Sequence, residues 1–240
     1  MQINHIIRSL IEALENTETS VCLMTDEIGS PIHPEYLTTA NICSQLAREK
    51  TKLGINKPII NAEVQTRIIE RQILQFSKKR SLISRNGRVD VEVVEGCGMI
   101  QKPRIVVEAK GFLQFKQNGD IYKGSFDEIS KDIYRNKQIV SACIAQNTGP
   151  ICAASTFFVK DQNSLTEGQG SAFLELIKQK LLALKPTDIS YTFDVELKTM
   201  TCSNLYSDTH IPGVSIDGEM PEEELNPPSH IICGVIYMHS

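Results

Sequence analysis

The sequence predicts an α/β protein in which a mixed central sheet is flanked by helices. Segments with apolar residues at helical spacing alternate along the chain with short runs rich in Val and Ile, which are typical of strands. The 240 residues are 41% hydrophobic and 22% charged, as in an ordinary globular protein. A chain of this length is expected to form one large domain, or one domain with additions.

Residues 1–57 are predicted to form an N-terminal helical extension. Residues 1–16 carry apolar side chains at helical spacing with charged residues between them, which predicts an amphipathic helix. Because charge interrupts these apolar positions, they do not form the apolar core of a signal peptide. A second helix is expected at 36–51, after a segment broken by Gly and Pro.

Residues 58–160 are predicted to form the core of the domain. A helix over 61–76 is expected to begin this core, with Asn61 as its cap and Glu63 in its first turn. An Asn-Gly dipeptide of the kind that hairpins favour then separates a short strand from two longer ones. The three strands are expected near residues 81–84, 88–94 and 104–110.

The rest of the chain is expected to alternate helices and strands. A helix that starts at Ser125 or Asp127 leads to a buried strand at 151–159, which closes the core. Residues 161–240 are predicted to complete the same domain. They are expected to contain a helix at 171–185, strands at 189–197 and 230–238, and a polar surface loop at 200–229.

Two carboxylates and an amine are predicted to converge at one end of the sheet. Glu108 and Lys110 share one face of their strand, because side chains alternate between faces. If Asp90 lies opposite them on the neighbouring strand, the three form one patch. The ordinary alternative is a solvated face with a cross-strand salt bridge. However, the flanking Val- and Ile-rich runs predict strands buried on both faces, where charges are costly unless paired or bound to metal.

These residues resemble the signature of the PD-(D/E)XK, or restriction-endonuclease-like, nuclease superfamily. That signature is an acid on the second strand and an acid-x-lysine on the third strand of an αβββαβ core. Val89-Asp90 resembles its first half, and Glu108-Ala109-Lys110 resembles its second half. The resemblance covers about residues 61–160. The proline that names the motif is replaced by Val89.

The resemblance implies a metal-dependent DNA endonuclease that uses Mg²⁺, which Mn²⁺ could replace. It implies that Asp90 and Glu108 are metal ligands, with the backbone carbonyl of Ala109 as a third ligand. Lys110 would position the attacking water or neutralise charge that develops in the transition state. It would act as a general base only if its pKa were lowered.

A further acid is expected from the first core helix of such a nuclease. Glu63, near the start of the predicted helix, is the first choice for this catalytic acid, and Glu70 is the alternative. The simpler interpretation of Glu63 is a negative charge that interacts favourably with the N-terminus of a helix.

A basic cluster next to this site is predicted to contact DNA phosphates, although such clusters are also common on solvated faces. It consists of Lys78, Lys79, Arg80, Arg85 and Arg88. The resemblance also implies that the helix after the motif turns a polar residue toward the substrate. The candidates are Lys131, Arg135, Lys137 and Gln138.

The resemblance implies double-stranded DNA as the partner, and restriction or phage defence as the role of a free-standing chain of this size. Two cuts on opposite strands need two sites, so a homodimer or higher homo-oligomer is expected. The net charge of −4 gives no global attraction to nucleic acid, so binding must depend on a local basic patch. RNA remains open as a substrate. The alternative is a catalytically silent module with the nuclease fold that binds a partner or senses a ligand.

Cysteine usage and hydropathy bear on the cellular setting. The seven cysteines are scattered, odd in number and without a C-x-x-C pair, which favours a reduced, cytoplasmic location. No run approaches the roughly 18 apolar residues of a membrane helix, so no membrane partner is expected.

Overall fold

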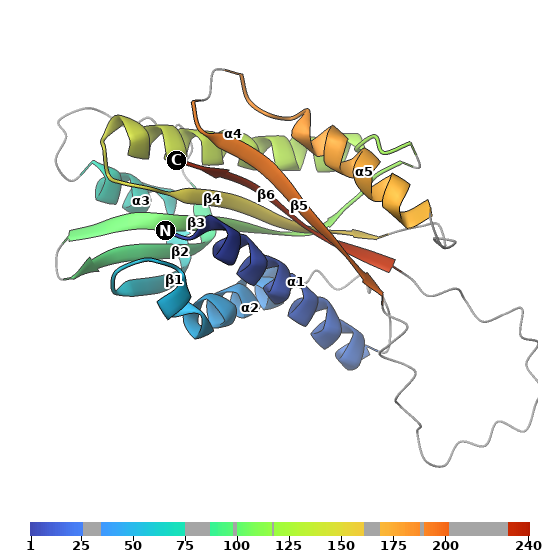
Figure 1. Cartoon of the computed structure of the whole chain (residues 1–240), viewed down its shortest axis with the longest axis horizontal. Helices are drawn as coiled ribbons and strands as arrows, with labels where there is room; N and C mark the ends of the chain where they lie inside the picture. Colours follow the sequence, from blue (N-terminus) through green and yellow to red (C-terminus); the bar gives the residue numbers. More distant parts are fainter. Residues whose placement is uncertain are drawn as a thin grey trace, which may run out of the picture.

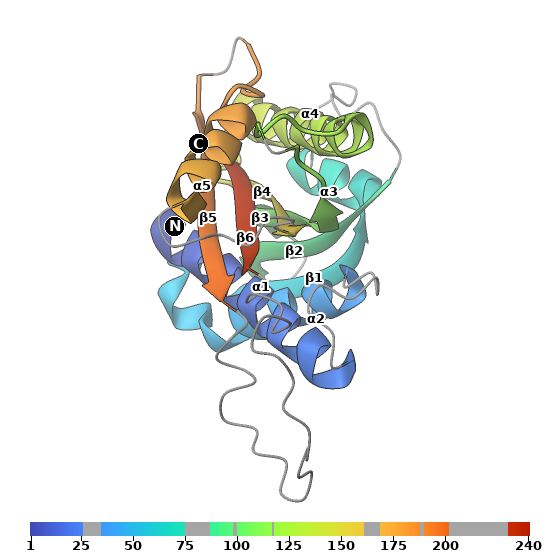
Figure 2. The same cartoon turned by 90° about the vertical axis from the view of Figure 1, so that its right-hand side faces the viewer.

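The computed structural model describes residues 1–25, 35–74, 87–97, 100–116, 118–160, 169–187, 190–201 and 230–240. These residues form three layers, with helices on both faces of a six-stranded mixed sheet (Figures 1 and 2). The prediction of an α/β fold with a mixed central sheet flanked by helices is confirmed.

Within the described residues, the strands lie in the order β1-β2-β3-β4-β6-β5. Neighbouring strands are antiparallel except β3 and β4, which are parallel. A parallel pair needs a long crossover, and a helix supplies it here. The strands are β1 (Pro58–Gln65), β2 (Arg88–Cys97), β3 (Ile100–Leu113), β4 (Cys152–Lys160), β5 (Thr192–Thr201) and β6 (His230–His239).

The helices divide between the two faces of the sheet (Figure 2). The first two, α1 (Ile3–Thr25) and α2 (Glu35–Arg48), pack on one face and are followed by a short 3₁₀ turn, Lys50–Lys52. The other face is covered by α3 (Thr66–Ile73), the crossover helix α4 (Lys123–Ala145) and α5 (Gln169–Leu182). The N-terminal helices therefore share a core with the sheet.

The hydrophobic core follows the alternation of side chains along the strands. On β3, Val106 packs in the cluster on the α4 side, whereas Val107 packs in the cluster under α1 and α2. On β6, Gly234 leaves room for the ring of Phe157 on β4, because a Cβ atom at Gly234 would lie 2.2 Å from that ring. Because β4 is covered on both faces, all of its residues from 152 to 159 are buried.

Most predicted elements are present, but the helix expected at 61–76 is wrong. Residues 58–65 form β1, and α3 begins only at Thr66. The apolar residues of this segment matched a helical period because the strand is an edge strand with irregular burial, and Glu63 has a positive φ of 54° that breaks the alternation. The strand expected at 81–84 lies outside the described residues, as does nearly all of the loop expected at 200–229.

Candidate functional site

The candidate site lies where strands β2 and β3 stop pairing. Their ladder ends where Val91 lies opposite Val107. Continuing the same register places Asp90 opposite Glu108. Here the Asp90 Oδ2 atom accepts a hydrogen bond of 2.6 Å from the backbone N–H of Ala109. A side-chain carboxylate thus serves as the acceptor for this backbone group at the point where the strands diverge.

Glu108 is almost completely buried and faces α4. Nη1 of Arg135 donates to Oε1 of Glu108, and it also donates to the backbone carbonyl of Arg88 at 3.1 Å. Nη2 of Arg135 lies 3.8 Å from Oδ1 of Asp132, one turn earlier on α4. The guanidinium group therefore joins α4 to the start of β2 and to the middle of β3.

Lys110 lies on the same face of β3 as Glu108, because both side chains contact residues of α4. Its Nζ atom is 3.2 Å from Oδ2 of Asp132. Burial alone would lower the pKa of Lys110, but the carboxylates of Asp132 and Glu108 raise it above its ordinary value. Lys110 is therefore an ammonium group at neutral pH, which favours a charge-stabilising or water-positioning role over that of a general base.

Both candidate metal-binding carboxyl groups have raised pKa values. Burial raises the pKa of Asp90, although the hydrogen bond from Ala109 opposes the shift. Burial also raises the pKa of Glu108 to about 8; the charge of Arg135 lowers it, whereas Asp132 and Asp90 raise it. A cation bound between the two carboxyl groups would stabilise their ionised forms.

These donors fit Mg²⁺. No three His, Cys, Asp or Glu side chains form a metal-binding group within the described residues. Mg²⁺ needs fewer protein ligands, because it usually keeps several waters and takes one or two carboxylates. The raised pKa values of Asp90 and Glu108 come mainly from burial, and a bound cation would oppose that effect. For Ala109, the contact in the structure is through the N–H, so the carbonyl ligand remains a prediction.

Glu63 lies near the site, but not for the reason predicted. It belongs to the edge strand β1 and not to the first turn of a helix. The register of β1 and β2 places it opposite Asp90. Its side chain is 42% exposed and lies 3.8 Å from Nη1 of Arg88. A catalytic role for Glu63 would therefore start from a solvated ion pair.

Glu35 is an acid near the site that sequence reasoning missed. It is the first residue of α2, the helix that precedes the three antiparallel strands β1, β2 and β3. Burial is the main cause of the raised pKa of Asp90, and the negative charges of Glu63 and Glu35 make smaller contributions in the same direction. Glu35 also helps to raise the pKa of Lys110. Its position at a helix start after Pro34 was the available signal, but that helix was not expected to reach the site.

The polar residues of α4 that face the sheet were only partly anticipated. Arg135 was one of four candidates, whereas Asp132 and Asn136 were missed. Asn136 is buried, and its Nδ2 donates to Oγ of Ser155 on β4 at 3.1 Å. All three residues are buried on α4, and they are interspersed with its buried apolar residues, such as Ile129 and Ile133. Polar residues at core positions of an amphipathic helix were the signal that could have found them.

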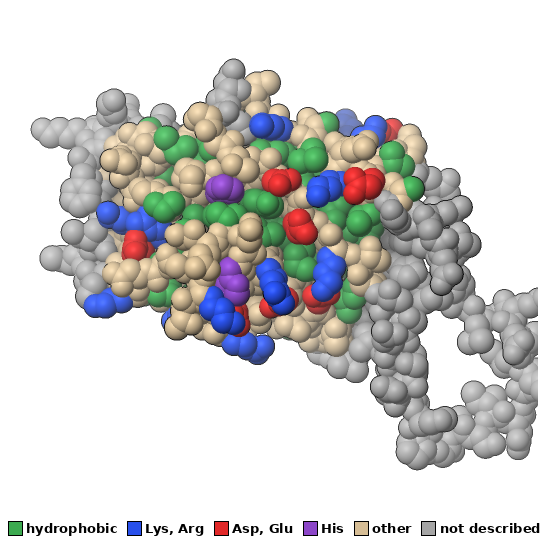
Figure 3. Space-filling model, viewed as in Figure 1, with side chains coloured by type: hydrophobic (Ala, Val, Ile, Leu, Met, Phe, Trp, Pro, Cys, Tyr) green, Lys and Arg blue, Asp and Glu red, His purple; other side chains and the backbone are tan. Residues whose placement is uncertain are grey.

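The predicted DNA-contacting cluster is only partly described by the structure. Arg88 starts β2 and is exposed, and its side chain approaches Glu63. The other four residues, Lys78, Lys79, Arg80 and Arg85, lie outside the described residues. Among the described residues on the face shown in Figure 3, acidic and basic side chains are interspersed and form no single basic patch.

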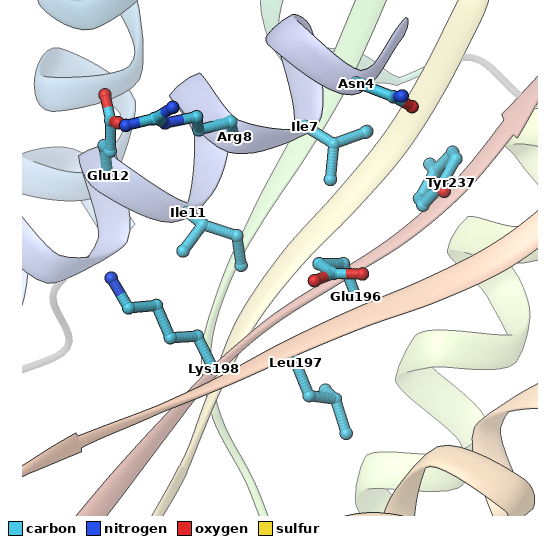
Figure 4. Close-up of a pocket in the computed structure, with 9 residues that line it drawn as sticks. All are labelled: Asn4, Ile7, Arg8, Ile11, Glu12, Glu196, Leu197, Lys198 and Tyr237. Atoms are coloured by element: carbon cyan, nitrogen blue, oxygen red, sulfur yellow. The ribbon is translucent and has the colours of Figure 1, made fainter.

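A separate cavity lies on the opposite face of the sheet (Figure 4). It has a volume of about 440 Å³ and is lined by residues of α1, β5 and β6. Its apolar wall includes Ile7 and Ile11, which belong to the core cluster under α1 and α2. Its Arg8 and Lys198 are paired with glutamates of α1, Glu12 and Glu15. Because both of its cations are already paired, this cavity is a weaker candidate for chemistry than Asp90 and Glu108.

Glu92, two residues after Asp90, provides a stability test beside the site. It is fully buried, and its Oε2 accepts a hydrogen bond of 3.2 Å from Asn61. Burial raises the pKa of Glu92, and hydrogen bonds from Asn61 and Gln72 only partly offset this. The folded protein therefore holds the proton to higher pH than the unfolded chain, so Glu92 costs stability as the pH rises above the unfolded-state pKa.

The Glu92→Gln variant is expected to be more stable than the wild type by about 1 kcal/mol at pH ~8. The difference is expected to shrink toward zero near pH ~4, where Glu92 is largely protonated in both the folded and the unfolded wild-type chain. Urea unfolding of both proteins at the two pH values measures this. A variant that is less stable at the higher pH would show that Glu92 is stabilising as a carboxylate.

None of the described helices is long and apolar enough to cross a membrane. No family model, no curated protein and no solved structure matches the chain. The function is therefore inferred from the site itself.

Proposed function

We propose that this chain is a Mg²⁺-dependent DNA endonuclease whose centre consists of Asp90, Glu108 and Lys110. The observation that carries the proposal is that Asp90 lies opposite Glu108 in the continued β2–β3 register and that the charges of Asp90, Glu108 and Lys110 affect one another's pKa values. The strand order around them also supports it. An antiparallel trio, β1, β2 and β3, is followed by a helical crossover to the parallel strand β4, as the αβββαβ resemblance implies.

In this proposal Asp90 and Glu108 hold the metal ion, because carboxylate oxygens are its preferred protein ligands. When bound, Mg²⁺ supplies a Lewis acid for the phosphoryl oxygen and an acidified water. The Ala109 hydrogen bond fixes the Asp90 carboxylate, and Arg135 fixes that of Glu108. Both ligands are thus oriented before a metal ion or DNA arrives.

Lys110 stabilises negative charge on the phosphate in this proposal. Its contact with Asp132 keeps it protonated and limits the directions in which its Nζ can point. About a quarter of the side chain remains exposed, so a phosphate oxygen can reach it. A fixed cation next to developing charge is an efficient form of electrostatic catalysis, because it needs no reorganisation during the reaction.

The second candidate function is a catalytically silent module with this fold. Two observations favour it: Glu108 is already paired with Arg135, and the described residues contain no group of three metal-binding side chains. Against it, Asp90, Glu108 and Lys110 are all retained. The two functions differ in metal binding, which a silent module would lack at Asp90 and Glu108.

The wider role that we propose is restriction or phage defence on double-stranded DNA in the cytoplasm, by a homodimer or higher oligomer. The physical reason for the oligomer is that one site cuts one strand, so a double-strand break needs two sites. Light scattering of the chain during cleavage tests this. Double-strand cleavage by a monomer would contradict the oligomer.

Cleavage of supercoiled plasmid, linear duplex DNA and RNA by the purified chain tests the proposed activity. We expect nicked or linear plasmid with Mg²⁺ or Mn²⁺ and intact plasmid with EDTA. Cleavage confined to RNA would keep the centre and change the substrate. Intact substrates under every metal condition, together with no metal binding, would favour the silent module.

A further inference from the structure

We infer that the centre holds a single divalent cation, because Arg135 occupies one oxygen of Glu108 and supplies the positive charge that a second cation would bring. The inference rests on the proposed metal centre and goes beyond it by assigning its stoichiometry. It also assigns Arg135 as a positioning residue that acts through Glu108. In two-metal sites the ions lie about 4 Å apart and share carboxylates between them.

Arg135 is a fixed part of the site. Its side chain is 9% exposed, and Nη1 donates both to Glu108 and to the Arg88 carbonyl. Nη2 faces Asp132, whose own side chain is 3% exposed. An arginine cannot lose its proton at ordinary pH, so it cannot withdraw its charge when a metal ion approaches. Displacing it would leave a buried guanidinium without its partners, which is costly.

The contacts leave one oxygen on each candidate ligand. Oε1 of Glu108 accepts from Arg135, and Oδ2 of Asp90 accepts from the Ala109 N–H. Among the described residues, no hydrogen bond involves Oε2 of Glu108 or Oδ1 of Asp90. Two monodentate carboxylates with waters form a usual Mg²⁺ site. Two adjacent ions would need bridging or bidentate carboxylates, so each carboxylate would have to share an oxygen that already accepts a hydrogen bond.

The charges of the site support the same stoichiometry. When all are ionised, Asp90, Glu108, Asp132 and the nearby Glu35 carry four negative charges, and Lys110 and Arg135 balance two of them. One divalent cation therefore neutralises the remaining negative excess. A second would leave an excess of two positive charges in a largely buried site, and this would oppose its binding.

Mn²⁺ binding to the full chain without DNA tests the inference, because it does not depend on activity. Calorimetric titration, with free Mn²⁺ followed by electron paramagnetic resonance, gives the number of ions per chain. We expect one ion in the wild type and none in Asp90→Asn. For Arg135→Gln we expect Mn²⁺ to bind at least about tenfold more tightly, with a second ion becoming detectable, because a neighbouring positive charge is removed.

Lys131→Gln is the matched control, because Lys131 is an exposed cation on the same helix whose loss should leave Mn²⁺ binding unchanged. If Arg135 only held the site in shape, its loss would weaken metal binding. Weaker Mn²⁺ binding by a folded Arg135→Gln protein would therefore overturn the inference. If that variant does not fold, the wild-type stoichiometry decides. Two ions per wild-type chain, both lost in Asp90→Asn, would refute the single-ion inference and leave the proposed nuclease intact. No bound ion would refute both.

Discussion

Replacing Asp90 by Asn is expected to abolish metal-dependent DNA cleavage, with a loss of about 10³-fold or more. The substitution removes the charge of one metal-binding carboxylate and leaves its shape. An Asn side chain can still accept the Ala109 hydrogen bond through its amide oxygen, so the end of the β2–β3 ladder is expected to persist. The loss should therefore appear in activity and metal binding and not in folding.

The Glu92→Gln variant provides a matched control for Asp90→Asn. It makes the same acid-to-amide change two residues further along β2, at a buried carboxyl that contacts Asn61 on β1 and not the α4 cluster. We expect this variant to cleave DNA as the wild type does. Initial rates of plasmid nicking, with circular dichroism to check the fold, measure both variants. An Asp90→Asn protein that cleaves at the wild-type rate would place the centre elsewhere.

Arg135→Met is expected to destabilise the protein by about 3 to 5 kcal/mol in EDTA. The substitution leaves the buried carboxyl group of Glu108 and the Arg88 carbonyl without their shared donor. A buried charge without a partner costs far more than the intact pair contributes. Methionine approximates the length of the arginine stem, so the loss should come from the missing guanidinium more than from a cavity.

The double variant Arg135→Met with Glu108→Gln is expected to recover much of that stability, because the carboxyl group that needed the guanidinium is gone. Urea unfolding of the wild type, both single variants and the double variant completes a double-mutant cycle. Purely additive effects would show that the Arg135–Glu108 contact contributes no coupling to the folded state, which would also undermine the positioning role of Arg135.

The elements that carry the site were largely predictable from the sequence. The alternation of Val and charged residues predicted β2 and β3, and placed Glu108 and Lys110 on one face. Their contacts with Asp132 and Arg135 on α4 confirm that shared face. Alternation is a local property of an extended chain, so it can be read without knowing the fold.

The partners of the site were not predictable in the same way. Whether Arg135 meets Glu108 depends on how α4 packs across β3, and this is set by the tertiary structure. The position of Glu35 depends on how α2 meets the sheet. The helix expected at 61–76 failed because β1 owes its extended form to pairing with β2, and pairing with a distant segment outweighs local propensity.

The proposed function is tested most directly by plasmid cleavage with identically purified wild-type and Asp90→Asn proteins, each with Mg²⁺, Mn²⁺ or EDTA. Matched purification matters because a contaminating nuclease would be the same in both preparations. We expect cleavage by the wild type with metal, none with EDTA, and none by Asp90→Asn under any condition. Equal cleavage by the two proteins, or none by a wild type that also binds no metal, would contradict a nuclease centre at Asp90 and Glu108.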